Sequence, residues 1–520
     1  MYLHVIVAYF LLFWWPEPPR ASPWLASGGA TVLLVFGKLP VIWAAATWAA
    51  ARARRAERAP AANSSRIQRF YHQVTFVLSV ATVFGLAADL GLTSWPQMVR
   101  GVGWIGAVPG LADLVILTPF FASLIVLWVA SYPVERSVRE SIMRVRQMET
   151  PGARRLPIWT LPRYLTFQVR HQLLIAAVPM TLILSAYRLS QQHHAKLVDW
   201  LRIPWVDQAV LALTAAVVFV FAPVLLRVIW ATSPLPDGPL RRRLDSLCRR
   251  IGLRYRDILV WHSHHMMVNA AVMGLLPRVR YVLLSDALLD SMDTDRIECV
   301  FGHEAGHMRL HHIQYFLLFA GAGMLVVSGI VELLIRMFTG PGARFVLSQT
   351  AIEGAGFVAV LVVWGLGFGW VSRRFERHAD VYGVRCLGIS IKQCSLPCGR
   401  HSGDMRANPD CLCTTAAAKF ASALDRVAVL SGIPHDEPSW RHSSIGSRIR
   451  FITSLAGDVV RLQSYERLVR RIKVSLWVGT ISGLLIATWY VASRPDYRDV
   501  FMYNFVKPFT DGESARFGAY

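Results

Sequence analysis

Residues 298–334 contain the segment Glu298-Cys-Val-Phe-Gly-His303-Glu304-Ala-Gly-His307, followed shortly by the apolar run Ile313–Leu334. On a helix, the two histidines of this H-E-x-x-H pattern lie one turn apart on the same face and can bind one metal ion. The apolar run has the roughly 20 residues that a helix needs to cross the core of a bilayer. The stretch therefore predicts a metal-binding helix that runs directly into a membrane span.

The composition of the whole chain agrees with a membrane protein. Of its 520 residues, 54% are hydrophobic and only 17% are charged, whereas ordinary globular domains carry about 25% charged residues. This composition excludes a disordered chain, a collagen-like fibre and an ordinary water-soluble enzyme.

Nine apolar segments are candidates for membrane spans. Tryptophans near their ends, such as Trp95, Trp230 and Trp489, are typical of the membrane–water interface. The first segment lacks the basic start and the cleavage site of a signal peptide, so we expect it to be retained. The nine segments are Tyr2–Trp15, Ala30–Ala50, Val74–Leu92, Leu111–Ala130, Leu173–Leu189, Val210–Trp230, Ile313–Leu334, Thr350–Val371 and Val474–Val491.

The net charge of +22, from 55 basic and 33 acidic residues, raises the question of a nucleic-acid partner. The basic residues, however, gather in every second loop, in Arg52–Arg69, Arg136–Arg163 and Arg241–Arg256, and the loops between carry few charges. The positive-inside rule predicts this alternation for a protein with a cytoplasmic N-terminus. The charge therefore indicates topology, and we expect no nucleic-acid partner.

Two hydrophilic segments, residues 233–312 and 372–471, are large enough to fold outside the bilayer. The charge alternation places both on the cytoplasmic side, and only a two-span hairpin, residues 313–371, separates them. We therefore expect one split domain. An N-terminal membrane region of about six spans, residues 1–232, precedes it, and a final span with a tail, residues 472–520, follows it.

The H-E-x-x-H motif contains the residue types of a catalytic zinc site. Neutral imidazoles of His303 and His307 can bind zinc, and Glu304 can accept a proton from the water that attacks a carbonyl. A chance match is one alternative, although the composition predicts far fewer than one such match in a chain of this length. A helix of interfacial histidines, which would include His311 and His312, is another.

A catalytic zinc ion needs a third protein ligand, which must come from outside this motif. Glu376 and Asp380 lie four residues apart, so a metal ligand and a carboxylate that orients another ligand can share one helix face. The alternative is a solvated helix face with both carboxylates paired to neighbouring arginines. Topology favours the metal site, because His307 lies just before one span and Glu376 lies just after the next, on the same membrane face.

With these two motifs the chain resembles the integral-membrane zinc metallopeptidases (gluzincins) that include the CAAX prenyl proteases and the HtpX-like quality-control proteases. The resemblance covers roughly residues 235–455. It implies a mainly α fold, a polytopic helical membrane protein with a split zincin-like metallopeptidase domain that contains a small β-sheet. It also implies that His303, His307 and Glu376 bind one Zn²⁺ ion, that Glu304 activates water and that Asp380 orients a ligand histidine.

Three further segments match the pattern of this family. Asn269, followed by Ala270 and Gly274, corresponds to an asparagine that contacts the substrate backbone. The apolar run Arg280–Ser285 corresponds to the family's edge strand, along which a bound peptide gains main-chain hydrogen bonds. His442 and Arg448 correspond to residues that help to stabilise the oxyanion, with Ser443 where the family has proline.

Four cysteines, Cys394, Cys398, Cys411 and Cys413, form a separate cluster in a polar insertion, with His401 between them. A second, structural zinc site is one interpretation, although the spacing is not that of a standard zinc ribbon or finger. The simpler interpretation is free thiols in a loop. A disulfide is the alternative if the topology is inverted, because disulfides are rare on the cytoplasmic side.

Together these features predict a multi-pass membrane zinc endopeptidase whose peptidase domain lies on the cytoplasmic side of a bacterial inner membrane. The expected partners are the lipid bilayer and a protein or peptide substrate, taken in quality control or in CAAX-type processing. Two other classes stay open. One is a sensor that cleaves a single cytosolic repressor, and the other is a transporter in which the histidine cluster is incidental.

Overall fold

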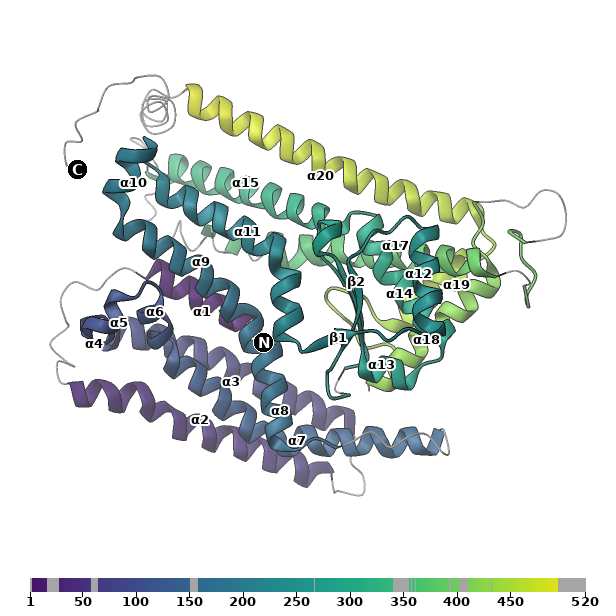
Figure 1. Ribbon diagram of the computed structural model, residues 1–520, viewed down its shortest axis with the longest axis horizontal. Helices are drawn as coiled ribbons and strands as arrows, with labels where there is room; N and C mark the ends of the chain where they lie inside the picture. Colours follow the sequence, from purple (N-terminus) through teal and green to yellow (C-terminus); the bar gives the residue numbers. More distant parts are fainter. Residues whose placement is uncertain are drawn as a thin grey trace. The chain divides into compact units, whose positions relative to one another are not determined.

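The computed structural model describes residues 2–15, 28–57, 64–149, 158–265, 267–339, 355–356, 358–360, 362–391, 394–401, 410–431 and 433–493. These residues divide into two compact units. Unit 1 contains the described residues up to Thr232 together with His262–His265, and unit 2 contains the other described residues from Ser233 onwards (Figure 1).

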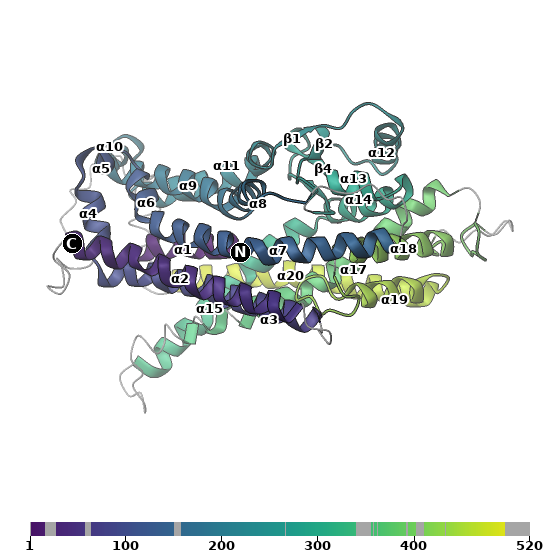
Figure 2. The same cartoon turned by 90° about the horizontal axis from the view of Figure 1, so that it is seen from below.

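Unit 1 consists almost entirely of helices. Helix α2 packs against α3 and α7, and α9 packs against α1 and α11 (Figures 1 and 2). The helices are α1 (Tyr2–Trp14), α2 (Gly28–Glu57), α3 (Ser64–Leu92), α4 (Trp95–Gly101), α5 (Gly103–Ala107), α6 (Leu111–Ile116), α7 (Thr118–Glu149), α8 (Leu161–Gln168), the π-helical segment η2 (Val169–Leu174), α9 (Ile175–Gln192), α10 (His194–Leu201) and α11 (Val206–Ile229).

The buried charges of unit 1 are paired. Lys38 on α2 forms an ion pair with Asp89 on α3. Asp113 on α6 accepts a hydrogen bond from Nε of Arg188 on α9 at 3.2 Å. Both aspartates are only 4% exposed. Because an unpaired charge within an apolar segment is costly, these pairs explain how the helices tolerate their acidic residues.

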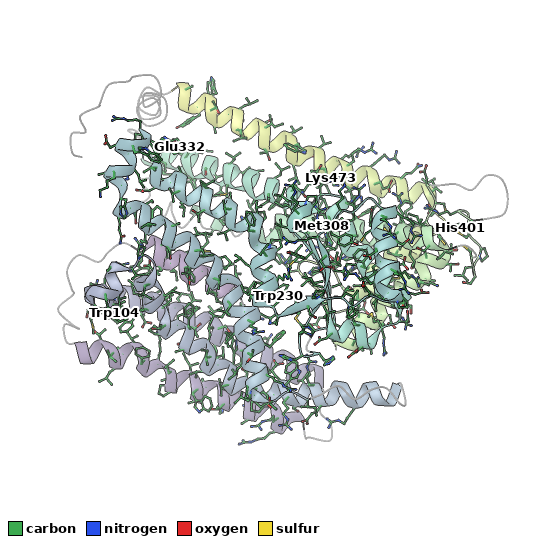
Figure 3. All side chains as sticks on the ribbon, viewed as in Figure 1. Trp104, Trp230, Met308, Glu332, His401 and Lys473 are labelled. Atoms are coloured by element: carbon green, nitrogen blue, oxygen red, sulfur yellow. The ribbon has the colours of Figure 1, made fainter. Side chains whose placement is uncertain are left out.

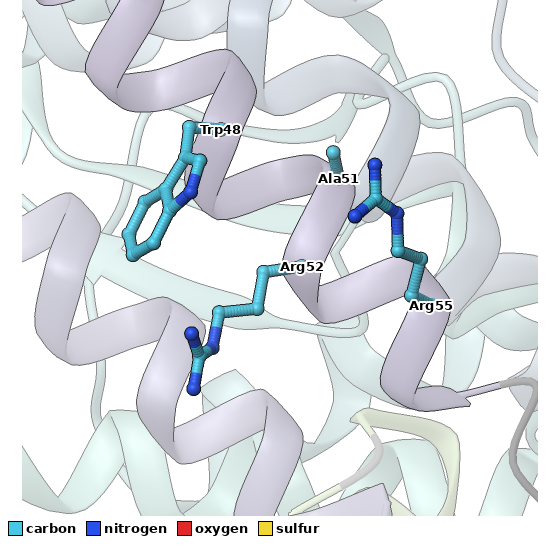
Figure 4. A pocket seen from close by; sticks show the side chains of 4 residues that line it. All are labelled: Trp48, Ala51, Arg52 and Arg55. Atoms are coloured by element: carbon cyan, nitrogen blue, oxygen red, sulfur yellow. The ribbon is translucent and has the colours of Figure 1, made fainter.

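The C-terminal part of α2 combines aromatic and basic side chains. Trp48, Ala51, Arg52 and Arg55 line a depression on the surface of unit 1 (Figure 4). The guanidinium carbon of Arg52 lies 5.6 Å from the ring centre of Trp48 and 5.7 Å from that of Phe70. Tryptophan and arginine at the end of a long apolar helix are typical of a bilayer interface.

Unit 2 combines a small sheet with helices of mixed polar and apolar sequence and with long apolar helices. Its elements are β1 (Thr232–Pro234), α12 (Pro239–Arg250), β2 (Asp257–Trp261), β3 (Ala270–Met273), the 3-10 turn η3 (Pro277–Val279), β4 (Tyr281–Ser285), α13 (Asp286–Ser291), α14 (Thr294–Arg309), α15 (His312–Thr339), the π-helical segment η4 (Val363–Phe368), α17 (Gly369–Ser390), α18 (Thr414–Ser431), α19 (Ile445–Leu455) and α20 (Val459–Ser493).

The sheet has the strand order β1-β2-β4-β3. Strand β4 pairs in parallel with β2, with Asp257 opposite Tyr281, and antiparallel with β3, with Ala270 opposite Leu284. All five residues of β4 are buried. The prediction that Arg280–Ser285 forms the edge strand is therefore wrong, because this segment pairs on both sides. The edge strand next to β4 is β3, which follows Asn269 directly.

The helices α14 and α17 approach each other closely because small residues line both of them. A Cβ atom on Gly302 would lie 3.3 Å from Cα of Gly383, and one on Gly306 would lie 3.2 Å from Cα of Ala379. On each helix these small residues are four positions apart, so they form a continuous stripe. The stripe brings the His303 face of α14 against the Glu376 face of α17.

Helix α14 does not run directly into the next membrane helix, contrary to the prediction. It ends at Arg309, and His311 adopts the left-handed conformation with φ of 59° before α15 begins at His312. A left-handed residue cannot continue an α-helix. The ammonium group of Lys473 on α20 donates to the carbonyl oxygen of Leu310 at 2.8 Å and so satisfies one free acceptor at this break (Figure 3).

Eight helices within the described residues are long and apolar enough to cross a membrane. The predicted first span, Tyr2–Trp15, forms α1, whose 13 residues are shorter than the other candidates. The predicted span Thr350–Val371 lies partly outside the described residues, and its remainder belongs to the apolar stretch Val358–Ser390. The prediction of a mainly helical, polytopic membrane protein with a small sheet is confirmed.

The close contact between α14 and α17 leads to a testable stability effect. A Cβ atom on Gly383 would lie 2.7 Å from Cε2 of Phe420 and 3.1 Å from the backbone nitrogen of His303. We expect Gly383→Ala to destabilise unit 2 by about 1–3 kcal/mol, because the neighbouring helices must move apart. Thermal unfolding of the detergent-solubilised protein measures this change. Gly329→Ala on α15 is the control, since nothing lies within 4 Å of its new Cβ atom, and equal melting temperatures for both variants would contradict the expectation.

Candidate active site

Helix α14 positions the two motif histidines. Its first turn is fixed by Asp293, whose carboxylate accepts a hydrogen bond from the backbone nitrogen of Arg296 at 2.9 Å. One helical turn separates His303 from His307, and their ring centres lie 4.9 Å apart. Both imidazoles therefore face the same neighbour, helix α17.

Three donor atoms from these two helices converge on one point. Nε2 of His303 lies 3.3 Å from Nε2 of His307 and 3.6 Å from Oε2 of Glu376, and Nε2 of His307 lies 3.4 Å from Oε1 of Glu376. Tetrahedral zinc with ligand bonds of about 2.0–2.2 Å places its donor atoms about 3.3–3.6 Å apart. The three side chains thus have both the chemistry and the spacing of a zinc site.

The carboxylate of Asp380 holds His303 from the side away from this point. Its Oδ1 atom lies 2.9 Å from Nδ1 of His303. Arg448 on α19 donates to Asp380 from Nε at 2.9 Å and from Nη2 at 2.5 Å. The buried carboxylate therefore has a partner for each of its oxygens, and the tautomer of His303 with a proton on Nδ1 leaves Nε2 for a metal.

The electrostatic environment of the two histidines differs. Burial, with the nearby His303, lowers the pKa of His307 to about 3, which keeps this imidazole neutral. Burial also acts on His303, but the hydrogen bonds that it donates to the carboxylates of Asp380 and Glu376 outweigh burial and raise the pKa of His303 to about 10. The two carboxylates thus favour positive charge at the point where the donor atoms meet, as a cation site requires.

Glu304 and His442 lie beside the three donor atoms. Burial raises the pKa of Glu304 to about 7, a range in which a carboxyl group can both accept and donate a proton near neutral pH. Nδ1 of His442 lies 2.9 Å from Oε2 of Glu376, and the imidazole is half exposed. Ser443 follows with φ of 62°, a conformation that the proline expected from the family pattern cannot adopt.

Two further histidines contact the site, and the sequence analysis gave them no role there. Nδ1 of His312 lies 3.1 Å from Nδ1 of His307, and Nε2 of His312 lies 3.1 Å from Nδ1 of His378. The buried ring of His312 also stacks on Phe375, with ring centres 4.4 Å apart. His312 therefore orients the ring of His307, as Asp380 orients the ring of His303. The spacing of five residues gives no helical signal, because the left-handed residue His311 interrupts the helix between His307 and His312.

This contact predicts an effect of His312 on metal binding. We expect His312→Ala to weaken zinc binding by His303, His307 and Glu376 by about 10–100-fold, because His307 loses the group that orients its ring. Asparagine can place an acceptor oxygen near the position of Nδ1, so His312→Asn should retain most of the affinity. The measurement is peptide cleavage by chelator-treated protein as zinc is restored, and equal zinc requirements for wild type and His312→Ala would contradict this role.

Asn269 lies at the start of the edge strand. Its backbone pairs with Ser285, and its side-chain oxygen accepts a hydrogen bond from the backbone nitrogen of Ala270 at 2.9 Å. Strand β3 packs against α14, the helix that carries His303. Gly274 ends the strand with φ of 110°, where a Cβ atom would lie 2.6 Å from the carbonyl oxygen of Val279, so this turn requires glycine.

The structure also brings three of the four clustered cysteines together, and His401 takes the place of the fourth, Cys411. The side chains of Cys394, Cys398, His401 and Cys413 converge. Cys411 is not in this group, since its thiol instead contacts the carbonyl oxygen of Leu412 at 3.6 Å. All of these cysteines are free thiols.

Comparisons with known proteins agree with this geometry. Residues 234–393 match the family described as "Peptidase family M48". The chain is 28% identical over 195 residues to the CAAX prenyl protease 1 homolog of Arabidopsis thaliana, covering 35% of this chain and 44% of that protein. It is 24% identical over 284 residues to the protease HtpX homolog of Aeropyrum pernix, covering 49% of this chain and 88% of that protein.

The similarity to CAAX proteases is local. CAAX prenyl protease 1 of Saccharomyces cerevisiae is 35% identical over 92 residues, which is 20% of that protein. The matched region thus spans less than half the length of both CAAX protease relatives. The crystal structure of S. mikatae Ste24p is similar with a TM-score of 0.44 and 14% identity, covering 84% of this chain and 100% of that chain.

The M48 match includes the H-E-x-x-H helix as well as Glu376 and Asp380. Eight apolar helices accompany this region in the described part of the chain. Residues 234–393 are therefore similar to peptidase family M48, and the chain is a multi-pass membrane protein that resembles the CAAX protease and HtpX-like group of metallopeptidases.

Proposed function

We propose that this protein is a zinc-dependent endopeptidase that cleaves membrane-associated proteins or proteins at the cytoplasmic face of the membrane. One observation carries the proposal. The donor atoms of His303, His307 and Glu376 lie within 3.6 Å of their neighbours, and Glu304 is on the same helix. This arrangement supplies three protein ligands and a general base, which a catalytic zinc site for peptide hydrolysis requires.

The side chains have distinct roles in this mechanism. His303, His307 and Glu376 would hold the zinc ion, which when bound polarises the scissile carbonyl and makes a water molecule more acidic. Glu304 accepts a proton from the attacking water and then donates it to the leaving amine. Asp380 keeps Nδ1 of His303 protonated, so that Nε2 keeps its lone pair.

We propose that His442 and Arg448 stabilise the negative charge that develops on the carbonyl oxygen. His442 is half exposed and lies against Glu376, so a substrate can reach it. The Nη1 atom of Arg448 lies 3.8 Å from Oε2 of Glu376, while its other nitrogens bind Asp380. Arg448 therefore acts mainly by holding Asp380 and adds positive charge to the site.

The substrate binds in an extended conformation along β3 in this proposal. Strand β3 is the edge of the sheet next to β4 and packs against α14. A peptide that pairs with such an edge gains main-chain hydrogen bonds with little demand on its sequence. The side-chain oxygen of Asn269 is held by Ala270, which leaves its amide nitrogen to donate to a substrate carbonyl.

The location follows from the distribution of arginine. The loops Arg52–Arg69, Arg136–Arg163 and Arg241–Arg256 are basic, and the loops between carry few charges. We therefore place the split peptidase domain, residues 233–312 and 372–471, on the cytoplasmic side, and we propose a bacterial inner membrane for the spans. Quality control or CAAX-type processing is the function that this placement favours.

Substrates can be found by comparing membranes that contain the wild-type protein with membranes that contain Glu304→Gln. Mass spectrometry of protein N-termini should show new termini only with the wild type. Glu437→Gln is the matched control, since Glu437 is exposed and lies outside the site. Many cleaved membrane proteins indicate quality control, and one cleaved repressor indicates a sensor. Identical sets of termini for wild type and Glu304→Gln would contradict the proposed function.

A further inference from the structure

A second group of metal-ligand side chains lies between α17 and α18, outside the site described above. Cys394, Cys398 and His401 follow the end of α17 at Ser390, and Cys413 directly precedes the start of α18 at Thr414. His401 lies at the periphery of unit 2 (Figure 3). Residues from the two ends of one insertion thus meet at a single point.

The distances within this group fit a metal better than a disulfide. The Sγ atoms of Cys394 and Cys413 lie 3.6 Å apart, and Nδ1 of His401 lies 3.2 Å from Sγ of Cys394 and 3.7 Å from Sγ of Cys398. A disulfide bond is about 2.05 Å long. Tetrahedral zinc with Zn–S bonds of about 2.3 Å and a Zn–N bond of about 2.0 Å places its donor atoms about 3.5–3.8 Å apart.

A backbone donor lies beside one of these sulfur atoms. The backbone nitrogen of Ala416, in the first turn of α18, lies 3.4 Å from Sγ of Cys413. This donor, at the start of an 18-residue helix, offsets part of the cost of burying the thiolate, which is the form that binds metal.

We propose that Cys394, Cys398, His401 and Cys413 bind a structural zinc ion, separate from the catalytic one. Three cysteines and one histidine are an established donor set for structural zinc with all four positions filled by protein. Such a site has no open position for substrate. The same geometry excludes Cys411 as a ligand, although it is the cysteine nearest to Cys413 in the sequence.

The position of this site explains what it does for the enzyme. Cys394 and Cys398 pack against the core formed by α17, α18 and α19, which includes Leu412 and Phe420. Phe420 also contacts α17 at Gly383, next to the backbone of His303. A zinc ion there joins the end of α17 to the start of α18 and so fixes two helices that pack on α14.

The test is the metal content of the full-length protein in detergent, with zinc present during expression. We expect two zinc ions per chain in the wild type, one in His303→Ala/His307→Ala and one in Cys394→Ser/Cys398→Ser. Cys411→Ala is the matched control for Cys413→Ala, because both thiols are buried and only Cys413 belongs to the group. Cys411→Ala should retain two zinc ions, and Cys413→Ala should retain one.

Replacement of zinc by Co²⁺ separates the two sites by their ligands. Only the cysteine site has thiolate ligands, so the thiolate-to-cobalt charge-transfer absorption should persist in His303→Ala/His307→Ala and disappear in Cys394→Ser/Cys398→Ser. The histidine variant leaves the cysteine insertion intact, so its spectrum decides the question even if the cysteine variants fail to fold. Loss of all metal from this variant, the absence of a thiolate band, or a Cys394–Cys413 disulfide in the purified wild type would each overturn the proposal.

The outcomes also distinguish this proposal from the proposed function. If only the catalytic zinc exists, the cysteine variants keep one zinc ion and the histidine variant has none. If only the structural zinc exists, the histidine variant keeps one zinc ion with its thiolate band, and the cysteine variants have none.

Discussion

Replacing Glu304 by glutamine is expected to lower the rate of peptide cleavage by at least about 10²-fold while the zinc content stays that of the wild type. Glutamine has nearly the same shape as glutamate but cannot accept the proton of the attacking water. The ligands His303, His307 and Glu376 are untouched, so the metal stays bound. Cleavage of a fluorogenic peptide and metal analysis of the same protein sample measure the two effects together.

Glu304→Gln is expected to lose activity without losing zinc, and this separates it from a variant that loses a metal ligand. Replacing the ligand Glu376 by alanine should remove the catalytic zinc and the activity together, because two histidines alone give an incomplete site. If Glu304→Gln retains more than a tenth of the wild-type rate, Glu304 is not the general base. If it loses the zinc as well, its effect is structural rather than catalytic.

Replacing Arg448 by alanine is expected to destabilise unit 2 by about 3–5 kcal/mol, because it leaves the carboxylate of Asp380 buried without the guanidinium that binds both of its oxygens. Asp380 is fully buried, and Arg448 binds both of its oxygens. Lysine keeps the positive charge but cannot form the two parallel hydrogen bonds, so Arg448→Lys should recover only part of the stability. Thermal unfolding in detergent measures these differences.

A second ion pair on the same helix provides the control for Arg448. Arg450 lies 3.3 Å from Asp436, but both side chains are at least 70% exposed. Arg450→Ala should therefore change stability by less than about 1 kcal/mol. Similar effects of Arg448→Ala and Arg450→Ala would show that burial does not strengthen the Arg448–Asp380 pair. They would contradict the claim that Arg448 holds Asp380 in place against His303.

Much of the candidate site could be predicted because its motifs follow helical spacing. His303 and His307 are four residues apart, as are Glu376 and Asp380, and each pair shares one face of its helix. The two apolar runs between the pairs indicated that the motifs meet at one side of the membrane. The structure brings all four side chains together, with α14 packed against α17.

The close approach of these helices also has a pattern in the sequence. Gly302 precedes the first motif and Gly306 lies within it, while Ala379 lies within the second motif and Gly383 follows it, so both pairs have the same spacing. Small residues four apart on two helices indicate close packing. This pattern would have supported the pairing of the two motifs without any argument from topology.

Other features could not be predicted from local spacing. Whether Arg280–Ser285 or Ala270–Met273 forms the edge depends on which strands pair, and β4 pairs with β2 across an intervening segment. The role of His312 depends on the left-handed residue His311, which ends α14 and turns the next ring back towards His307. His401 replaces Cys411 in the second cluster because the fold of the insertion, rather than residue type, sets which donor atoms meet.

The most direct test of the active-site assignment is a crystal structure with anomalous scattering data collected at the zinc absorption edge. The account predicts a peak about 2.0–2.2 Å from Nε2 of His303, Nε2 of His307 and a carboxylate oxygen of Glu376. Catalytically active protein that lacks a peak at this position, or that shows its metal held by other side chains, would contradict the account.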